Sequence, residues 1–221
     1  TRTEELLMLS RLTLSCALLL TVPAVALAEE EGKWEQKAES DGVVVYTRER
    51  KGTDVKEVKA VGVIDAPPQQ VFRVLADYER YKEIMPYTDE SKVVATEQEG
   101  KVVHFYSLIN APFVSKRDYT LRIVDQSDWK DGAGYLKSYW TSSDKGPPPK
   151  DGVVRVQKNE GSWHLEPLDG GKKTRANYWV FTDPGGSLPT FIVNKANSSA
   201  IPDVYKALRK HSKEARYADK K

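Results

Sequence analysis

The sequence predicts an α+β domain in which a curved antiparallel sheet of about nine strands wraps around a long C-terminal helix. The first observation is a long region, Ser91–Thr182, in which apolar and polar residues alternate with the period of a β-strand. The second is that helical periodicity lies outside this region, in Asp65–Met85 before it and Leu188–Leu208 after it. Helices segregated from a run of strands are typical of α+β domains, and a strongly twisted sheet of this size curls.

Turn residues divide the chain into the expected strands. Lys51–Asp54 is expected to be the turn of a hairpin, and Glu99–Gly100, Asp131–Gly132 and Asp169–Gly171 separate later strands. Short turns between consecutive strands predict an antiparallel meander. The expected strands are Val43–Arg50, Lys56–Ile64, Ser91–Thr96, Lys101–Leu108, Arg117–Val124, Tyr135–Thr141, Val153–Lys158, Ser162–Glu166 and Thr174–Thr182.

Two short helices are expected between the hairpin and the meander. Asp65 is a suitable N-cap, and Pro67 and Pro68 fall in the first turn, where proline is well tolerated. Tyr81–Met85 is expected to form the second short helix. Nearer the N-terminus, Trp34–Ala38 is expected to form one or two helical turns.

The C-terminal helix is the element around which the domain is expected to be organised. Gly185 and Gly186 break the chain, and Ser187 can cap a helix that begins at Leu188. Pro202 should bend or divide this helix, because proline lacks an N–H and clashes with the preceding turn. An apolar stripe recurs every four residues along it: Leu188, Ile192, Ala196, Ala200, Val204 and Leu208.

A second set of residues lies beside this stripe and mixes apolar with polar side chains: Phe191, Asn194 and Ile201. A stripe that only sealed a core would not need the asparagine. Two interpretations therefore stay open: a helix that packs on the core, or a hinged lid over a cavity.

Residues 1–28 are interpreted as a signal peptide. The apolar run Leu12–Leu20 is too short to span a bilayer, and Ala26–Ala28 has the small-x-small pattern that precedes a cleavage site. We therefore expect export to a bacterial periplasm with cleavage after Ala28. A start at Met8 and lipidation at Cys16 are the alternatives.

The composition is that of an ordinary globular protein. The chain has 221 residues and a net charge of +2, which is too small to indicate nucleic-acid binding. Residues 29–221 contain no cysteine, so the predicted mature domain must be stabilised by burial without disulfides. We expect one domain over residues 29–221, with a core at about 34–210 and a basic C-terminal tail.

Three expected strands have one face that is bulkier and more polar than a sheet core needs. Strand alternation assigns three groups to this inward face, and it places Lys137 outside. A mostly apolar surface with a few polar groups is typical of a binding site, although an ordinary core with satisfied Tyr and Trp atoms fits too. The inward groups are Val102, His104, Tyr106 and Leu108; Arg117, Tyr119, Leu121 and Ile123; and Leu136, Ser138 and Trp140.

Four stretches together resemble the START family of lipid-transfer domains, within the helix-grip superfamily. They are Trp34 with SDGVVVYTR (40–48); Lys116–Tyr119; GVVRV (152–156) leading to GSWHLEPL (161–168); and DPGGSLPTFIVN (183–194). They occur in family order across about Trp34 to Lys210. The resemblance implies a sheet that grips the C-terminal helix, a cavity for one lipid or sterol, and a carrier rather than a catalyst.

The resemblance and the strand faces together give the predicted ligand-binding residues. The family often carries a buried acid–base pair in the cavity, and the corresponding positions here look like His104 and Ile123, so that pair is not reproduced. Sterol specificity is therefore not implied. The predicted ligand-binding residues are His104, Tyr106, Leu108, Arg117, Tyr119, Leu121, Ile123, Trp140, Phe191, Asn194 and Ile201.

Arg117 and Asp118 allow two interpretations. An arginine that enters an inward face must be paired, because an unpaired buried charge is costly. Arg117 could form a structural ion pair at the start of its strand, or it could hold a lipid headgroup or hydroxyl.

The search for catalytic chemistry leaves one alternative. His104, His164 and His211 have no metal-ligand spacing, and neither a phosphate loop nor a cofactor motif is found, so we expect no metal or cofactor. His104 beside Tyr106 could serve acid–base chemistry in a cyclase-like enzyme acting on an aromatic or polyketide-like substrate. An exported structural or stress-related domain without ligand is the third hypothesis.

The expected gate of the cavity consists of the C-terminal helix and the loop Gln126–Ala133. Trp129 in this loop suits contact with a membrane interface, and Gly185 and Gly186 precede the helix. The expected partners are a hydrophobic small molecule or lipid and, transiently, a membrane surface. We expect a monomer that does not bind nucleic acid.

Overall fold

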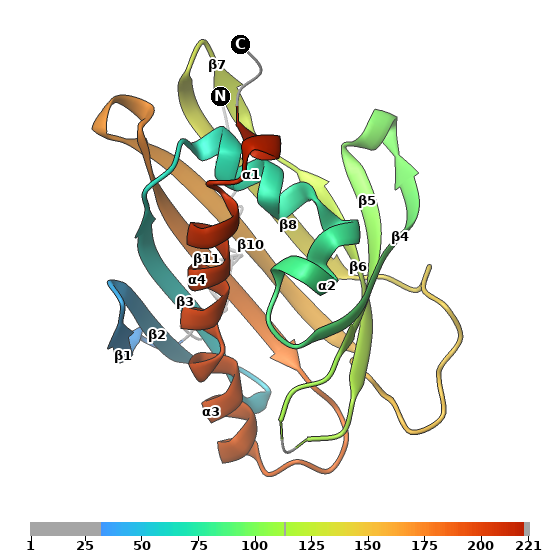
Figure 1. Cartoon of the computed structure of the whole chain (residues 1–221). Coiled ribbons are helices and arrows are strands. Elements are labelled where there is room, and N and C mark those ends of the chain that lie inside the picture. Colours follow the sequence, from blue (N-terminus) through green and yellow to red (C-terminus); the bar gives the residue numbers. More distant parts are fainter. Residues whose placement is uncertain (1–31, 113, 219–221) are drawn as a thin grey trace, which may run out of the picture. The chain divides into compact units, whose positions relative to one another are not determined.

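An antiparallel sheet forms the body of the domain (Figure 1). The computed structural model describes residues 32–112 and 114–218, and within them nine strands pair side by side in the order β1-β2-β3-β11-β10-β8-β6-β5-β4. They are β1 (Glu35–Ser40), β2 (Val43–Arg50), β3 (Thr53–Ile64), β4 (Thr88–Glu97), β5 (Val102–Ile109), β6 (Arg117–Asp125), β8 (Ala133–Ser142), β10 (Lys158–Leu168) and β11 (Lys173–Asp183). Off this path, β7 (Asp128–Lys130) pairs with β8, and β9 (Val154–Arg155) pairs with β6.

The predicted hairpin and meander are confirmed. The strands β2 and β3 pair across a turn at residues 51–52, and β4, β5, β6, β8, β10 and β11 are neighbours in chain order. The exception is β9, which runs parallel to β6, with Val154 opposite Arg117. The expected strand Val153–Lys158 shrinks to two residues there, and the preceding run Pro147–Pro149 supplies no N–H groups for a ladder.

Helices cover one face of this sheet (Figure 1). Between β3 and β4 lie α1 (Pro68–Ala76), a 3-10 turn (Tyr78–Arg80) and α2 (Tyr81–Ile84). After β11 come α3 (Thr190–Ser199), α4 (Ile201–His211) and a 3-10 turn (Ala215–Tyr217). Further 3-10 turns, Gln98–Gly100 and Asp169–Gly171, connect β4 to β5 and β10 to β11. The predicted α+β helix-grip class is therefore confirmed.

The C-terminal helix is divided as its proline predicts. Ala200 ends α3 and precedes α4, and Pro202 lies in the first turn of α4. The expected caps Ser187 and Asp65 are wrong, because Pro189 and Pro67 occupy the N-cap positions and no side chain caps either helix. Proline already restricts φ to a value compatible with a helix start, so the chain turns into each helix without a capping side chain.

The N-terminal segment of the described chain forms a strand, so the helical turns expected at Trp34–Ala38 are wrong. Residues 35–40 form β1, whose residues are all exposed and which pairs with β2. A strand exposed on both faces shows no apolar alternation, and its backbone pairing stabilises it. The Trp34 ring lies 4.7 Å from the guanidinium of Arg48, which holds this end against β2.

The two C-terminal helices are attached to the sheet in different ways. On α4, Ile201, Tyr205 and Leu208 are buried, and the Tyr205 hydroxyl donates to the carbonyls of Ala60 (3.2 Å) and Ala176 (2.8 Å). On α3, only Val193 is buried among the described residues. The helix α4 is therefore part of the hydrophobic core, whereas α3 lies at the margin of the core.

The predicted signal peptide, Met8, Cys16 and the cleavage site after Ala28 lie outside the described residues. The residues that the structure describes form one compact unit. No helix in this part of the chain has the length and apolarity that crossing a membrane requires.

Candidate functional site: a cavity between the sheet and the helices

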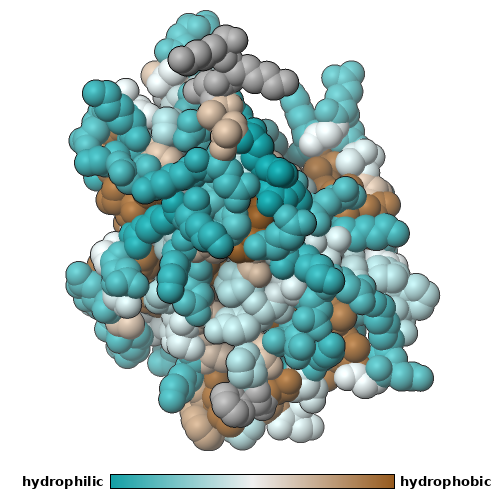
Figure 2. Space-filling view, viewed as in Figure 1, coloured by the Kyte–Doolittle hydropathy of each residue, from teal (hydrophilic) through white to brown (hydrophobic). Residues whose placement is uncertain are grey.

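A cavity of about 470 Å³ lies between the sheet and the helices. Strands β5, β6, β8, β10 and β11 provide its floor, and α2, α3, the start of α4 and residues Ala111, Pro112 and Val114 provide the other sides. The face seen in Figure 2 is mostly hydrophilic, and hydrophobic residues gather at its lower end, where Figure 1 shows α3. Apolar side chains of the sheet and of the helices therefore surround an open cavity and do not pack against one another there.

One end of the cavity is aromatic. The rings of Tyr81 and Phe105 lie 5.0 Å apart, those of Tyr78 and Phe105 lie 5.4 Å apart, and the Tyr81 hydroxyl donates to the Leu75 carbonyl at 2.5 Å. Burial raises the pKa of both Tyr78 and Tyr81, so both phenols stay protonated at neutral pH. This end offers flat, uncharged surfaces to a ligand.

A second group of aromatic rings lies on the sheet floor. The rings of Trp163 and Tyr178 are 4.5 Å apart, and those of Trp140 and Tyr178 are 5.9 Å apart. The Trp140 indole N–H donates to Asn159 Oδ1 at 2.9 Å, which satisfies the polar atom of that ring. All four side chains line the cavity.

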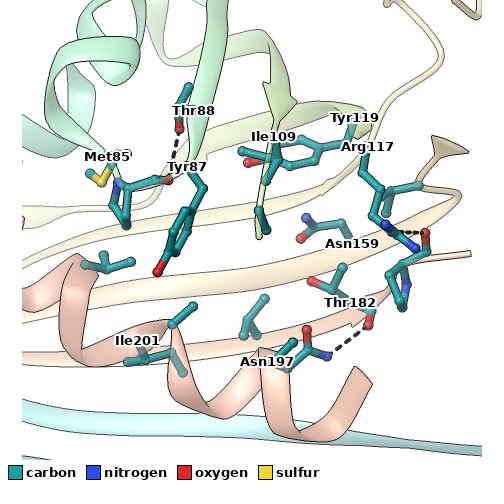
Figure 3. Close-up of a pocket in the computed structure, with 18 of the residues that line it drawn as sticks. Met85, Tyr87, Thr88, Ile109, Arg117, Tyr119, Asn159, Thr182, Asn197 and Ile201 are labelled. Atoms are coloured by element: carbon teal, nitrogen blue, oxygen red, sulfur yellow. Dashed lines mark hydrogen bonds between the residues drawn. The ribbon is translucent and has the colours of Figure 1, made fainter. Parts of the chain in front are cut away.

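The opposite end of the cavity is polar (Figure 3). Arg117, Thr182 and Asn197 lie there, and Met85 and Tyr87 lie at the other end of the view. The Arg117 guanidinium donates to the carbonyls of Ser115 (2.5 Å) and Pro184 (3.3 Å), and Asn197 Nδ2 donates to the Thr182 carbonyl at 3.3 Å. Burial lowers the pKa of Arg117 below its ordinary value. The cavity therefore distinguishes an apolar end from a polar, cationic one.

Six of the predicted ligand-binding residues line this cavity. Strand alternation along β6 is correct, since all four predicted residues of that strand point inward. The stripe predicted along the C-terminal helix is correct in part: Leu188, which precedes α3, and Ile192, Ala196, Ala200 and Val204 line the cavity, whereas Leu208 is buried in the core outside the lining. The six residues are Arg117, Tyr119, Leu121, Ile123, Trp140 and Ile201.

The predicted inward face of β5 is wrong by one residue. His104, Tyr106 and Leu108 lie outside the lining, and Phe105 and Ile109 line the cavity instead. Both faces of β5 are buried, because the chain after β8 covers its outer face, so hydrophobicity could not select one face.

His104 and Tyr106 instead join polar clusters on that outer face. His104 Nδ1 lies 2.7 Å from Ser143 Oγ, and its Nε2 lies 3.0 Å from Glu97 Oε1. The Tyr106 hydroxyl donates to Asp118 Oδ2 at 3.1 Å. The polar atoms of His104 and Tyr106 thus have partners outside the cavity, and neither side chain faces a ligand there as the cyclase-like alternative requires.

The interpretation of Arg117 as part of a structural ion pair is wrong, because no carboxylate pairs with this residue in the described part of the chain. Asp118 accepts from Arg155, at 2.6 Å from Nε and 3.0 Å from Nη2. Side chains of neighbouring strand residues point to opposite faces of β6. The Arg117 side chain therefore points into the cavity, and the Asp118 side chain points to the other face of the sheet. Arg155, on β9, is the partner that the sequence did not reveal.

Two predicted residues of α3 face away from the cavity. Phe191 is 73% exposed. Asn194 bridges to β3, where its Oδ1 accepts from the Lys56 N–H at 2.9 Å and its Nδ2 donates to the Asp54 carbonyl at 3.2 Å. The asparagine therefore fastens the helix to the sheet edge, which explains a polar residue beside an apolar stripe.

The predicted gate residues lie apart from one another. Trp129 belongs to β7, in a hairpin with β8 where a loop was expected, and its partly buried side chain packs against the core outside the cavity lining. Gly185 and Gly186 both have positive φ, 64° and 75°, and lie beside Val154. Glycine accommodates this backbone without strain, which lets the chain turn sharply from β11 toward α3.

Several lining residues escaped prediction. Tyr78, Tyr81 and Met85 come from short helices whose orientation toward the sheet the sequence does not reveal. Tyr178 could have been found, because the alternation of its strand places it on the same face as Val180 and Thr182. Across the described ranges, no group of three or more His, Cys, Asp and Glu residues could hold a metal ion.

Comparison with known proteins places this architecture in a family. A family model for polyketide cyclase / dehydrase and lipid transport matches residues 64–209. An uncharacterized protein of Pseudomonas aeruginosa is 29% identical over 200 residues, covering 90% of this chain and 95% of that protein. The human phosphatidylcholine transfer protein is 27% identical over 190 residues and 85% of each chain.

Solved structures show the same fold. A STAR-related lipid transfer protein fragment from Xanthomonas axonopodis superposes with a TM-score of 0.72 at 24% identity, covering 82% of this chain and 99% of that one. Human STARD10 superposes with a TM-score of 0.69 at 21% identity, covering 83% and 74%. The predicted resemblance to START domains is thus confirmed, and the chain belongs to the polyketide cyclase / dehydrase and lipid transport family.

Proposed function

We propose that this domain binds one lipid or similar hydrophobic molecule in the cavity and carries it as a non-catalytic transfer protein in the cell envelope. The observation that carries the proposal is a largely apolar cavity of about 470 Å³ with a polar group at one end. Small-molecule sites typically measure about 300–1,000 Å³ and combine apolar sides with a few polar groups. The relatives named as lipid transfer proteins support the same assignment.

The ionisable groups of the lining favour binding over acid–base chemistry. Among the described residues they are tyrosines and Arg117. Burial raises the pKa of Tyr119 and Tyr178 as it does for Tyr78 and Tyr81, so these phenols do not exchange protons readily near neutral pH. Such groups donate hydrogen bonds to a ligand and leave its covalent bonds intact.

The proposed location and the membrane contact rest on separate observations. The signal-like N-terminal sequence supports export to the periplasm. Phe191 is an exposed apolar residue on the helix whose other face lines the cavity through Ile192 and Ala196. We propose this end of the domain, rather than the Trp129 hairpin, as the membrane-contacting gate, with Gly185 and Gly186 as its hinge.

Solvent extraction of the purified protein, followed by mass spectrometry, tests the function. The matched variants are Ala196→Trp, which fills the cavity from α3, and Lys195→Trp, which adds the same ring at an exposed position outside the lining. We expect a lipid at one molecule per protein in the wild type and Lys195→Trp, and little in Ala196→Trp. An empty wild-type protein that also takes up no lipid from vesicles would contradict the proposal.

A further inference from the structure

The cavity contains a buried arginine without an acidic partner. Arg117 is 9% exposed and lines the polar end. Within residues 32–112 and 114–218, no carboxylate forms an ion pair with it, and the neighbouring Asp118 is paired with Arg155. Burial lowers the pKa of this guanidinium, but the group still keeps its charge at neutral pH, so this end of the cavity carries a positive charge.

Two backbone carbonyls hold this guanidinium in a fixed orientation. Nη1 donates to the Ser115 carbonyl at 2.5 Å, and Nε donates to the Pro184 carbonyl at 3.3 Å. No hydrogen bond of Nη2 is found among the described residues, and Nη2 would lie 3.8 Å from a Cβ atom at Gly186. Neutral carbonyls orient the group without neutralising it, so the charge remains available to a ligand.

Polar side chains that could complete an anion site lie at the same end. Asn159 Oδ1 accepts from the Trp140 indole, which leaves its Nδ2 donors without a partner in the described part of the chain. The Asn197 side chain lies across from Arg117 (Figure 3), where its Nδ2 donates to the Thr182 carbonyl at 3.3 Å. The N–H groups of Arg117 and of the Asn159 amide are donors only, so these two groups suit an oxyanion and not a cationic group.

We propose that Arg117 binds an anionic oxygen group of the cavity's ligand, a phosphate or a carboxylate, while the apolar part of that ligand extends toward Tyr78, Tyr81 and Phe105. This inference rests on the proposed function and narrows it to acid-bearing lipids. The anionic group of the ligand lies where β6 begins and β11 ends, beside Gly185 and Gly186. The apolar part of the ligand lies along the aromatic floor of the cavity. The ligand therefore enters apolar end first, and its headgroup is bound last.

Binding of three lipids with the same acyl chain tests the inference. The probes are a C16 fatty acid, a C16 lysophosphatidic acid and the uncharged C16 monoacylglycerol, each titrated into delipidated full-length protein in detergent-free buffer. We expect one or both anions to bind about tenfold or more tightly than the neutral lipid, as charge-assisted hydrogen bonds in a buried site allow. A preference for the phosphate identifies a phospholipid-type ligand, and a preference for the carboxylate identifies a fatty acid.

Matched variants assign the effect to one residue. Arg117→Gln should lose the preference for anions over monoacylglycerol, whereas Lys116→Gln, which removes the adjacent exposed charge paired with Asp89, should behave like the wild type. Arg117→Lys should retain part of the preference, because it keeps the charge and loses the fork of donors. If Arg117→Gln does not fold, the wild-type comparison decides whether the cavity prefers an anion, and Arg117→Lys compared with Lys116→Gln assigns the preference to Arg117.

The outcomes separate this inference from the function on which it rests. Equal affinity of the wild type for all three lipids would overturn the role of Arg117 and leave lipid binding intact. Binding of none of them, together with no lipid in the extracted protein, would overturn the proposed function itself.

Discussion

The ring of Tyr205 on α4 packs against the bare backbone of Gly62 on β3. A Cβ atom at Gly62 would lie 2.8 Å from Tyr205 Cε1 and 3.2 Å from a methyl group of Val43. Glycine thus allows α4 to approach the sheet closely enough for the Tyr205 hydroxyl to reach the carbonyls of Ala60 and Ala176. This contact sets the distance between the helix and the sheet.

Gly62→Ala should destabilise the domain by about 1–3 kcal/mol, as overpacking of a buried site does. The added methyl group must displace Tyr205 and weaken its two hydrogen bonds. Urea unfolding followed by tryptophan fluorescence measures the change. Val63→Ala, at an exposed neighbouring position, is the control, and an equal loss in both variants would show that the close contact is unimportant.

Asp118→Asn should cost about 3–5 kcal/mol of stability, because it leaves the Arg155 charge without its buried partner. Asp118 is 1% exposed and accepts from both Arg155 and Tyr106. Asp89→Asn, which breaks an exposed pair with Lys116, should cost less than about 1 kcal/mol. Denaturant unfolding of both variants would contradict this ranking if the two losses were equal.

Phe105→Ala should weaken lipid binding, whereas His104→Ala should leave it unchanged. The two residues are adjacent on β5, but Phe105 lines the cavity and His104 contacts Ser143 and Glu97 on the other face. Both variants will lose stability, so titrations with a fluorescent lipid must be made at a temperature where each is folded. Weakened binding in His104→Ala alone would mean that the strand faces are reversed.

Tyr87→Phe should speed the exchange of bound lipid between vesicles. Tyr87 lines the cavity, and its hydroxyl donates to Asp203 Oδ2 of α4 at 3.3 Å, so it closes a contact between the α2–β4 connection and the C-terminal helix. Loss of one exposed hydrogen bond should leave stability nearly unchanged. A fluorescent-lipid transfer assay measures the rate, and Tyr46→Phe, on β2 outside the lining, is the control.

Glu214→Gln should lose less stability than the wild type when the pH is lowered into the acidic range. A hydrogen bond and the nearby charge of His211, with further help from Arg80, lower the pKa of Glu214 below its ordinary value of 4.5. A carboxylate with a lowered pKa stabilises the folded state above its unfolded pKa, and this contribution is lost as pH falls through the folded value.

Thermal unfolding between pH 6 and pH 3 measures this difference between the wild type and Glu214→Gln. Glu99→Gln, at an exposed residue for which no ion pair is found among the described residues, serves as the control. A wild-type decline that matches that of Glu214→Gln over this range would refute the contribution.

The sequence predicts most of the fold but only part of the cavity lining. The alternation of apolar and polar residues predicted β6 and β8 and their inward residues, because the outer faces of these strands carry polar side chains such as Lys137. It failed on β5, since a strand buried on both faces carries no such contrast. It also missed Arg155 and the helix residues of the aromatic end, because contacts between distant segments depend on how the helices are oriented on the sheet.

The break at Ala200 has a consequence for how the protein opens. Because α4 shares the buried core and α3 is held largely by side-chain bonds from Asn194 and Asn197, the two helices need not unfold as one cooperative unit. Backbone amides of α3 should exchange with deuterium through a local opening, at rates far above those of α4, which require global unfolding. Under the proposed function, such a local opening would let a bound lipid leave while the core of the domain remains folded.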